Sequence, residues 1–205
     1  MSLCTFLKET IIGQRLLLGH SNIGNREPIL AEIAKIVSNN TDVSVLDLGI
    51  GGGNFGKLLK QRFNGKINPL IGVEVWKDYE NSQWGYYDRV EVQEIEIFLN
   101  ENTIKFDIIM LIDVLEHLPY KEGYNMLKKI LPLNRKKVIV STPVTKLAQK
   151  AHLGNQYQVH HYIWNEKELE DLGFEKVAQH KMLTFRIRPL TATGGVFVFS
   201  SGGAS

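Results

Sequence analysis

A run of glycines directly after a short apolar stretch is the part of the sequence best suited to chemistry. Residues 43–48 are apolar and partly β-branched, and four glycines fall within residues 49–53. Glycine accepts positive φ angles and lets backbone approach a ligand, and a helix that begins after such a turn offers free N–H groups to a carboxylate or phosphate. Because ligands of open α/β sheets bind at this edge, the turn is a candidate cofactor site.

The glycine spacing alone fits two classes of cofactor. Gly51-x-Gly53-x-x-Gly56 is the spacing of a dinucleotide fingerprint and would suit an NAD-type oxidoreductase. Asp47 stands just ahead of the turn, where a carboxylate would repel a pyrophosphate but could receive the ammonium group of an amino-acid moiety. Asp47 therefore favours an amino-acid-bearing nucleoside, and a purely structural turn is the remaining alternative.

A second acidic side chain is expected at the same edge of the sheet. Glu74 ends an apolar run, where a carboxylate can accept hydrogen bonds from ribose hydroxyls. Trp76, two residues later, could pack on the adenine or the sugar. Both cofactor classes would use Glu74 in this way, and an exposed charge at a strand end is the simpler alternative.

Three histidines are candidates for a general base: His117, His160 and His161. A neutral imidazole within hydrogen-bond reach could take the proton of a hydroxyl acceptor, although a structural imidazole is the alternative for each of them. His160 and His161 lie in residues 154–164, where polar and aromatic residues alternate. We expect this segment to be either a lid over the acceptor or an ordered surface connection.

Strands and helices alternate along the chain, which predicts a doubly wound α/β sheet. A break at Asn68-Pro69 precedes the second strand, and two final strands without an intervening helix predict an antiparallel hairpin at one edge. Residues 1–40 are expected to form a helical cap and residues 41–205 the catalytic domain. The expected strands cover residues 43–48, 70–75, 90–93, 106–112 and 137–141 with two runs after 174, and the expected helices cover 6–18, 28–37, 54–62, 120–131 and 165–172.

Composition narrows the class of protein. The chain has 205 residues, 43% of them apolar, which is enough for one sizeable core. Its 24 basic and 22 acidic residues nearly cancel, so no nucleic-acid surface is expected. A single cysteine, Cys4, and the lack of an apolar run near the roughly 20 residues of a membrane helix predict a cytoplasmic protein without disulfides. The sequence carries no signal for an oligomeric state.

Two motifs in this order resemble the class I S-adenosylmethionine-dependent methyltransferases: Asp47-x-Gly49-x-Gly51-x-Gly53 and Asp113-Val114-Leu115-Glu116-His117-Leu118. The resemblance runs from about residue 42 to residue 199. It implies a Rossmann-like, mostly parallel seven-stranded sheet whose last strand is antiparallel, and S-adenosylmethionine as the cofactor.

The resemblance also assigns roles to individual residues. The turn would line the methionine moiety, Glu74 the ribose, and Asp113 the end of the cofactor that carries the reacting methyl group. Glu94-Ile95 resembles the acidic position that meets the adenine amino group, although the family usually has Asp there. The expected cofactor-binding residues are Asp47, Gly49, Gly51, Gly53, Glu74, Val75, Trp76, Glu94, Ile95, Asp113 and Val114.

A metal site is an alternative interpretation of the second motif. Asp113, Glu116 and His117, with His160 or His161, offer mixed oxygen and nitrogen ligands. This set is similar to the Glu-x-x-Glu-His and later His of the small-RNA 3′-end methyltransferases, which use a divalent metal. Because the same string is widespread among metal-free relatives, no metal is predicted here.

Together these features predict a small-molecule methyltransferase, acting on a hydroxyl group of a metabolite, sugar or lipid precursor. The sulfonium activates its own methyl group, so the protein mainly supplies alignment, a dry site and a base where one is needed. The alternatives are an NAD-type oxidoreductase, a metal-dependent RNA 3′-end methyltransferase and a non-catalytic nucleoside-binding module.

Overall fold

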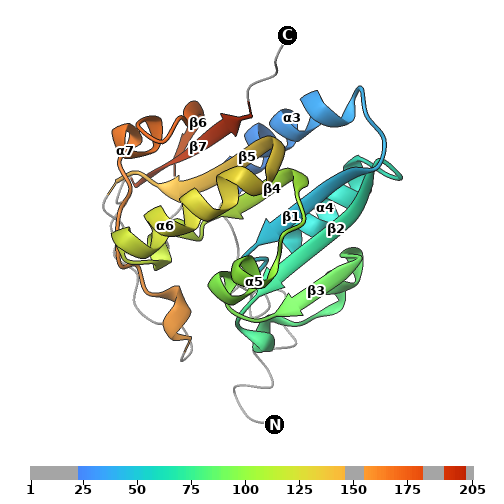
Figure 1. Ribbon diagram of the computed structural model, residues 1–205, viewed down its shortest axis with the longest axis horizontal. Coiled ribbons are helices and arrows are strands. Elements are labelled where there is room, and N and C mark those ends of the chain that lie inside the picture. Colours follow the sequence, from blue (N-terminus) through green and yellow to red (C-terminus); the bar gives the residue numbers. More distant parts are fainter. Residues whose placement is uncertain (1–22, 146–154, 182–191, 202–205) are drawn as a thin grey trace.

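The computed structural model describes residues 23–145, 155–181 and 192–201, which form a seven-stranded sheet between two helical layers (Figure 1). The strand order is β3-β2-β1-β4-β5-β7-β6. All strands run parallel except β7, which is antiparallel to both β5 and β6. The strands are β1 (Val43–Leu48), β2 (Ile67–Glu74), β3 (Arg89–Val92), β4 (Phe106–Ile112), β5 (Asn134–Pro143), β6 (Glu175–Lys181) and β7 (Thr193–Ser200).

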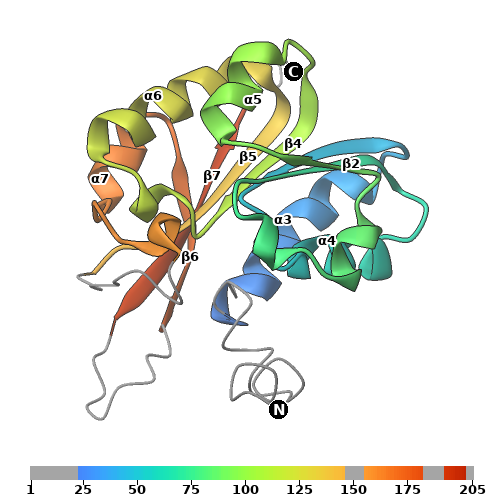
Figure 2. The same ribbon diagram turned by 90° about the horizontal axis from the view of Figure 1, so that it is seen from below.

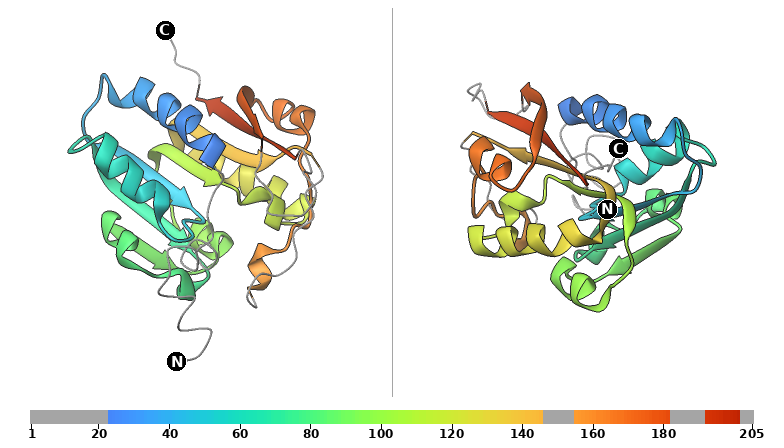
Figure 3. Two further views of the ribbon diagram at one scale, coloured as in Figure 1. Left: turned by 180° about the vertical axis from the view of Figure 1, so that it is seen from behind. Right: turned by 45° about the horizontal axis from the view of Figure 1, so that its top comes forward.

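The helices cover both faces of the sheet, as a doubly wound fold requires. Figure 2 shows helices on either side of the sheet. Figure 3, left, shows one pair of helices in front of the sheet. On that face are α3 (Arg26–Val37) and α4 (Asn54–Arg62); on the opposite face are α5 (Ile95–Glu101), α6 (Tyr120–Ile130) and α7 (Glu166–Glu170).

The central strands are buried on both sides, which explains their nearly continuous apolar sequences. Successive side chains of β1 point to opposite faces, so Val45 joins the core under α3 and α4, while Leu46 joins the core under α6. Apolar residues at helical spacing complete the two layers, such as Ile29 and Ile33 on α3 and Leu127 on α6. The predicted fold class is therefore confirmed, including the antiparallel hairpin at the edge.

The largest differences between the observed boundaries and the sequence expectations are in the second and fifth strands. Asn68-Pro69 was expected to precede the second strand, but both residues lie inside β2, which starts at Ile67. The strand continues because β2 pairs with β1 at Ile67 and again from Leu70, and the ladder shifts register between these points. β5 begins at Asn134, before its first expected residue, because polar residues also pair with β4.

The N-terminal region can be described only in part. η1 (Ile23–Asn25) leads into α3, which packs into the same core as β1 and β2. The helix expected over residues 6–18 lies outside the described residues. Within the described part of the chain, no helix is both long and apolar enough to cross a membrane.

The strand order reverses between β1 and β4, which makes their carboxyl ends the topological switch point of the sheet. The turn after β1, the end of β2 and the end of β4 meet there. These three segments carry Asp47, Glu74 and Asp113.

Candidate functional site

The glycine turn after β1 adopts the backbone conformation that its sequence predicts. Gly49, Gly51 and Gly53 have φ angles of +79°, +51° and +80°, a region that other residues rarely adopt. A Cβ atom on Gly49 would also lie 2.6 Å from Cγ2 of Val114, so glycine lets the segment after β4 approach the turn. The turn and Asp113-Val114 are thus in direct contact at the switch point.

Glu74 ties this turn to the end of β2. Its Oε2 accepts a hydrogen bond from Gly51 N at 2.8 Å and its Oε1 accepts one from Trp76 N at 2.9 Å. The side chain is buried, which raises the pKa of the carboxyl, while the N–H bonds of Trp76, Gly51 and Val75 oppose that rise. A carboxylate has about four acceptor positions, so two oxygens held in this way can still accept bonds from a ligand.

Asp47 lies deeper than its neighbours in the turn. Only 2% of it is exposed, and Tyr87 Oη donates a hydrogen bond to its Oδ2 at 2.7 Å. Burial raises the pKa of Asp47 to about 7, and the charge of Glu74 adds to the rise, whereas the Tyr87 bond opposes it. The carboxyl therefore titrates near neutral pH at the base of the turn.

Three side chains between β2 and β3 hold the turn from outside, and the sequence analysis did not identify them. Trp84 Nε1 donates to Gly51 O at 2.8 Å, and Asn81 Nδ2 donates to Gly52 O at 3.0 Å. Tyr87 Oη, besides donating to Asp47, accepts from Gly56 N at 3.0 Å. We call Asn81, Trp84 and Tyr87 the clasp. Their only sequence signal is the density of aromatic residues between two strands.

The clasp bears on the choice of cofactor. In a dinucleotide site the N–H groups at the start of the helix after the turn bind the pyrophosphate. Here Gly56 N, in the first turn of α4, donates instead to Tyr87, whose hydroxyl lies against the Asp47 carboxylate. A phosphate at this place would meet a negative charge and an N–H group already in use, so the geometry disfavours a dinucleotide.

Asp113 stands beyond β4 with an unusual backbone. Its φ of +55° is in the left-handed region, which is uncommon outside glycine and typical of functional turns. Ser141 Oγ donates to Asp113 Oδ1 at 2.8 Å, and Asn25 Nδ2 lies 3.4 Å from Oδ2. Asn25 is fully buried and also donates to Ser141 Oγ at 2.9 Å. Asn25 is a further residue at this site that no sequence pattern indicated.

Next to Asp113, the ligand atoms of Glu116, His117 and His160 lie within 4.8 Å of one another. Glu116 is almost fully buried and accepts a hydrogen bond from Thr142 Oγ1 at 3.0 Å. Burial raises the pKa of the Glu116 carboxyl well above its usual range, and the nearby charge of Asp113 adds to the effect. The group combines one oxygen and two nitrogen donors, so it could hold a cation or pass a proton.

The two histidines of this group have different surroundings. His117 Nδ1 lies 3.2 Å from the carbonyl oxygen of Val159, which can only accept, so Nδ1 carries the proton and Nε2 keeps its lone pair. Burial, with a smaller effect of His160, lowers the pKa of His117 to about 4. The rings of His117 and His160 meet edge to face with centroids 5.0 Å apart. His161 is exposed and joins the site through its backbone N, which donates to Glu116 O at 2.8 Å.

Residues 155–161, here called the strap, lie beyond the switch point. Asn155 Nδ2 donates to Tyr79 Oη at 3.0 Å, and both residues are buried. Tyr157 packs near Trp76, with ring centroids 6.3 Å apart, and its hydroxyl lies 3.5 Å from Glu94 Oε1. Figure 1 draws the strap in orange at the lower left. The contacts of Asn155 with Tyr79 and of Tyr157 with Trp76 connect the strap to the segment after β2.

The remaining expected residues are on the same side of the site as Glu74. Val75 and Trp76 follow β2 and are half-buried, and Glu94 is exposed immediately before α5. Ile95 is the first residue of α5 and packs against the core under α6. The expected cofactor-binding residues thus lie around a single edge of the sheet.

Comparisons with known proteins agree with this geometry. The profile of a family described as "Methyltransferase domain" matches residues 23–179. An uncharacterized protein of Methanocaldococcus jannaschii is 28% identical over 170 residues, which cover 80% of this chain and 72% of that protein.

Two solved structures have the same fold. Magnesium protoporphyrin IX methyltransferase of Synechocystis PCC 6803 with bound S-adenosylmethionine has a TM-score of 0.55 and 19% identity, covering 98% of this chain and 86% of the other. The 1,6-didemethyltoxoflavin-N1-methyltransferase of Burkholderia thailandensis has a TM-score of 0.56 and 18% identity, covering 84% and 76%. With the family match, they identify the cofactor as S-adenosylmethionine. The chain belongs to the class I S-adenosylmethionine-dependent methyltransferases.

Proposed function

We propose that the protein transfers the methyl group of S-adenosylmethionine to a hydroxyl group of a small molecule, such as a metabolite, sugar or lipid precursor. The observation that carries this proposal is the grouping of the His117–His160 pair with Asp113 just beyond the glycine turn. Two relatives of the same fold are named for small-molecule substrates, a magnesium porphyrin and a toxoflavin precursor.

The cofactor would lie along the switch point with its adenosine half toward β2. Glu74 would accept the ribose hydroxyls while keeping its bond to Gly51 N. Trp76, Val75 and the Glu94-Ile95 pair would surround the adenine. Gly49 and Gly53, with Asp47 beneath them, would border the methionine moiety, and Asp113-Val114 its methyl end.

Methyl transfer from a sulfonium is an in-line displacement. The acceptor oxygen attacks the methyl carbon as the carbon–sulfur bond breaks, and the hydroxyl proton must leave. We assign His160 as the base, because it lies on the strap that would cover the acceptor. His117 meets it edge to face and is itself fixed by the Val159 carbonyl, so His117 would orient the base. The third histidine of the sequence analysis, His161, has an exposed side chain and is not assigned as the base.

The test is a panel of small hydroxyl, amine and carboxylate compounds, incubated with the enzyme and S-adenosylmethionine. Formation of S-adenosylhomocysteine is followed and the methylated product is identified by mass spectrometry. We expect turnover with a hydroxyl acceptor, and kcat lowered about 10²-fold or more in His160→Ala, the range typical of a general base. His161→Ala is the matched control with kcat retained. Transfer only to amines or carboxylates would refute the hydroxyl assignment.

A second candidate function is metal-assisted methylation, supported by the convergence of Glu116, His117 and His160. Two imidazoles and one carboxylate suit Zn²⁺, Mn²⁺ or Co²⁺, and a bound cation would lower the pKa of an acceptor hydroxyl without a protein base. A ligand role would also fit the fixed orientation of the His117 ring, whose Nδ1 is held by the Val159 carbonyl.

Dialysis against a chelator, followed by metal analysis and activity assay, separates the two candidates. If a histidine is the base, the dialysed enzyme keeps full activity, and added Mn²⁺ or Zn²⁺ does not raise it. If the metal candidate is right, activity is lost on dialysis and returns with one cation. In that case Glu116→Gln would lower the affinity for the cation, measured by calorimetry.

A further inference from the structure

We propose that Tyr87 and Trp84 of the clasp are positioning residues that hold the glycine turn in its cofactor-binding shape before the cofactor arrives. This inference rests on the proposed cofactor site, since it concerns how that site is shaped. Both residues belong to a connection between strands that neither the motifs nor the family match assigns to the reaction.

Tyr87 links two parts of the turn that are nine residues apart, Asp47 and Gly56. Its hydroxyl donates to the Asp47 carboxylate and accepts from Gly56 N, and the tyrosine is buried. Gly53, the N-cap residue just before α4, has no side chain to cap the helix. Tyr87 therefore provides the missing cap from outside the turn, and fixes the Asp47 carboxylate with the same hydroxyl group.

The ring of Tyr87 also explains two glycines, one of which, Gly56, was expected to serve a ligand. A Cβ atom on Gly56 would lie 2.2 Å from Cε2 of Tyr87, and one on Gly72 would lie 3.0 Å from its Cδ1. A residue with a side chain at position 56 or 72 would therefore require the Tyr87 ring to move. Gly56, which completed the dinucleotide spacing, is thus required by the packing of a tyrosine.

Trp84 and Asn81 hold the opposite side of the turn. Trp84 Nε1 and Asn81 Nδ2 donate to the carbonyl oxygens of Gly51 and Gly52, while Glu74 accepts from Gly51 N. The peptide groups of the turn are thus bound from two directions. A Cβ atom on Gly53 would lie 3.0 Å from Cδ1 of Trp84, so the indole also lies against the start of α4.

Four glycines in one short turn leave the free chain with many conformations, and binding a ligand would have to select one of them. The clasp restricts these conformations in advance, because its hydrogen bonds join the turn to the connection between β2 and β3. A turn that is already ordered loses less entropy on binding, which increases affinity for the cofactor. The clasp bonds described above end on the turn, on Asp47 and on Gly56, and none of those bonds involves the strap.

The experiment compares Tyr87→Phe, which keeps the ring and removes the hydroxyl, with Tyr86→Phe, a half-buried neighbour outside the clasp. We expect Tyr87→Phe to raise both the dissociation constant and the KM of S-adenosylmethionine about tenfold, the loss associated with a bond to a charged group. The kcat at saturating cofactor and the KM of the acceptor should stay within about twofold. Tyr86→Phe should leave all four constants unchanged.

Trp84→Phe is the second variant, because it keeps an aromatic ring against Gly53 and removes only the bond to Gly51 O. We expect a KM increase for the cofactor of about threefold to tenfold, again without a change in kcat. Melting temperatures measured with and without S-adenosylhomocysteine show whether each variant is folded and how strongly the ligand stabilises it.

The outcomes are distinguishable. If the wild-type chain binds no S-adenosylmethionine in calorimetry, the proposed cofactor site fails. If the wild type binds it and both folded variants bind it equally well, the site stands and the clasp proposal is overturned. If kcat and the melting temperature both fall while the KM of the cofactor stays unchanged, the clasp proposal is likewise overturned. That result is the signature of a purely structural role.

Discussion

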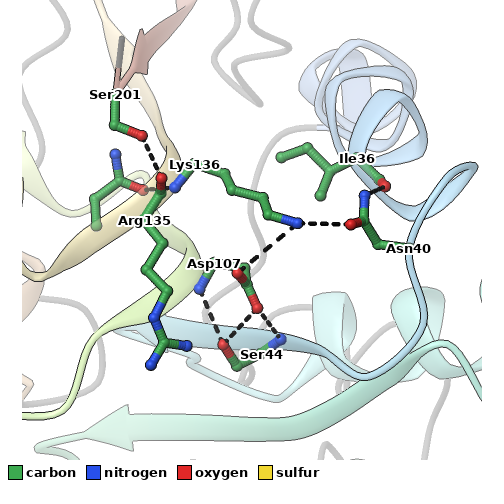
Figure 4. Close-up of polar contacts among 8 residues, drawn as sticks. Ile36, Asn40, Ser44, Asp107, Arg135, Lys136 and Ser201 are labelled. Atoms are coloured by element: carbon green, nitrogen blue, oxygen red, sulfur yellow. Dashed lines mark hydrogen bonds and ion pairs between the residues drawn. The ribbon is translucent and has the colours of Figure 1, made fainter. Parts of the chain in front are cut away.

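The two edges of the sheet treat their polar and charged side chains in opposite ways. At the amino edge, Asp107 accepts hydrogen bonds from Ser44 N at 3.0 Å and Ser44 Oγ at 2.9 Å, and its own N donates back to Ser44 Oγ (Figure 4). Lys136 Nζ lies 4.0 Å from this carboxylate and donates to Asn40 Oδ1 at 2.9 Å. This edge therefore pairs its charges and joins β1, β4 and β5.

At the carboxyl edge, Asp47, Glu74 and Glu116 are each at most 6% exposed. None of the ion pairs formed within the described part of the chain includes them. Burial raises the pKa of all three carboxyls. Charges that are buried without a cation cost stability, so this edge is arranged for a ligand, whereas the amino edge is arranged for folding.

The largest expected effect comes from relieving that cost at Asp47. Its pKa rises from 3.8 to about 7 on folding, so the protonated form is favoured in the folded state. Its stabilising contribution is therefore complete below pH 3.8 and is lost as pH rises through about 7. Asp47→Asn, which can still accept from Tyr87, should raise the free energy of unfolding at pH 8 by about 2 to 4 kcal/mol.

Denaturant unfolding of wild type and Asp47→Asn at pH 5 and pH 8 measures this difference, which should be smaller at pH 5 because the cost grows between pH 3.8 and about 7. Calorimetry at pH 8 should show weaker binding of S-adenosylmethionine by the variant, because the charge beneath the methionine moiety is lost. A variant that is less stable than wild type at pH 8 would break the contrast between the two edges.

Much of this arrangement could be predicted from short sequence patterns. Apolar runs located the central strands, and strand ends located Glu74 and Asp113, because residues that follow parallel strands meet at one edge. The positive φ angles of the turn followed from its glycines. These features are local, so a few neighbouring residues contain the information.

The clasp and Asn25 could not be predicted, because their partners are distant in the sequence and their segments have no periodicity. Tyr87 and Asp47 are 40 residues apart, and Asn25 and Asp113 are 88 residues apart. Gly56 was interpreted through ligand approach, although a tyrosine ring occupies the space. Pro69 predicted a strand boundary because proline has no backbone N–H to donate to a neighbouring strand. Pairing of β2 with β1 on both sides of Pro69 nevertheless keeps the strand intact.

A second prediction sharpens the comparison with one matched carboxylate from each edge. Glu74→Gln should weaken binding of S-adenosylmethionine about 100-fold. The amide has only one acceptor oxygen, and it lacks the negative charge toward which the ribose hydroxyls and Gly51 N would donate. Asp107→Asn should leave binding unchanged and lower the melting temperature. Calorimetric titration and thermal unfolding of both variants provide the test, and equal binding losses would contradict it.

The third prediction concerns the strap, which joins the two sides of the carboxyl edge. Asn155→Ala removes the buried bond to Tyr79 Oη, so the strap should close less completely over the acceptor. We expect the KM of the acceptor to rise about fivefold, the equivalent of roughly 1 kcal/mol. Gln156→Ala, at an exposed neighbouring position, is the control. Steady-state kinetics that show no difference between the two variants would refute the strap as an acceptor lid.

The smallest functional effect is expected at the amino edge itself. Ser44→Ala removes the hydroxyl that both donates to and accepts from Asp107, which should lower the free energy of unfolding by about 1 to 2 kcal/mol. The kcat and both KM values should stay within about twofold, because the carboxyl edge is not altered. Thr142→Val removes one hydroxyl at the other edge, where it donates to Glu116, and should instead lower kcat. Equal reductions of kcat in Ser44→Ala and Thr142→Val would contradict this prediction. A hydroxyl at the amino edge would then affect the rate of methyl transfer as strongly as a hydroxyl at the carboxyl edge, so the two edges would be coupled.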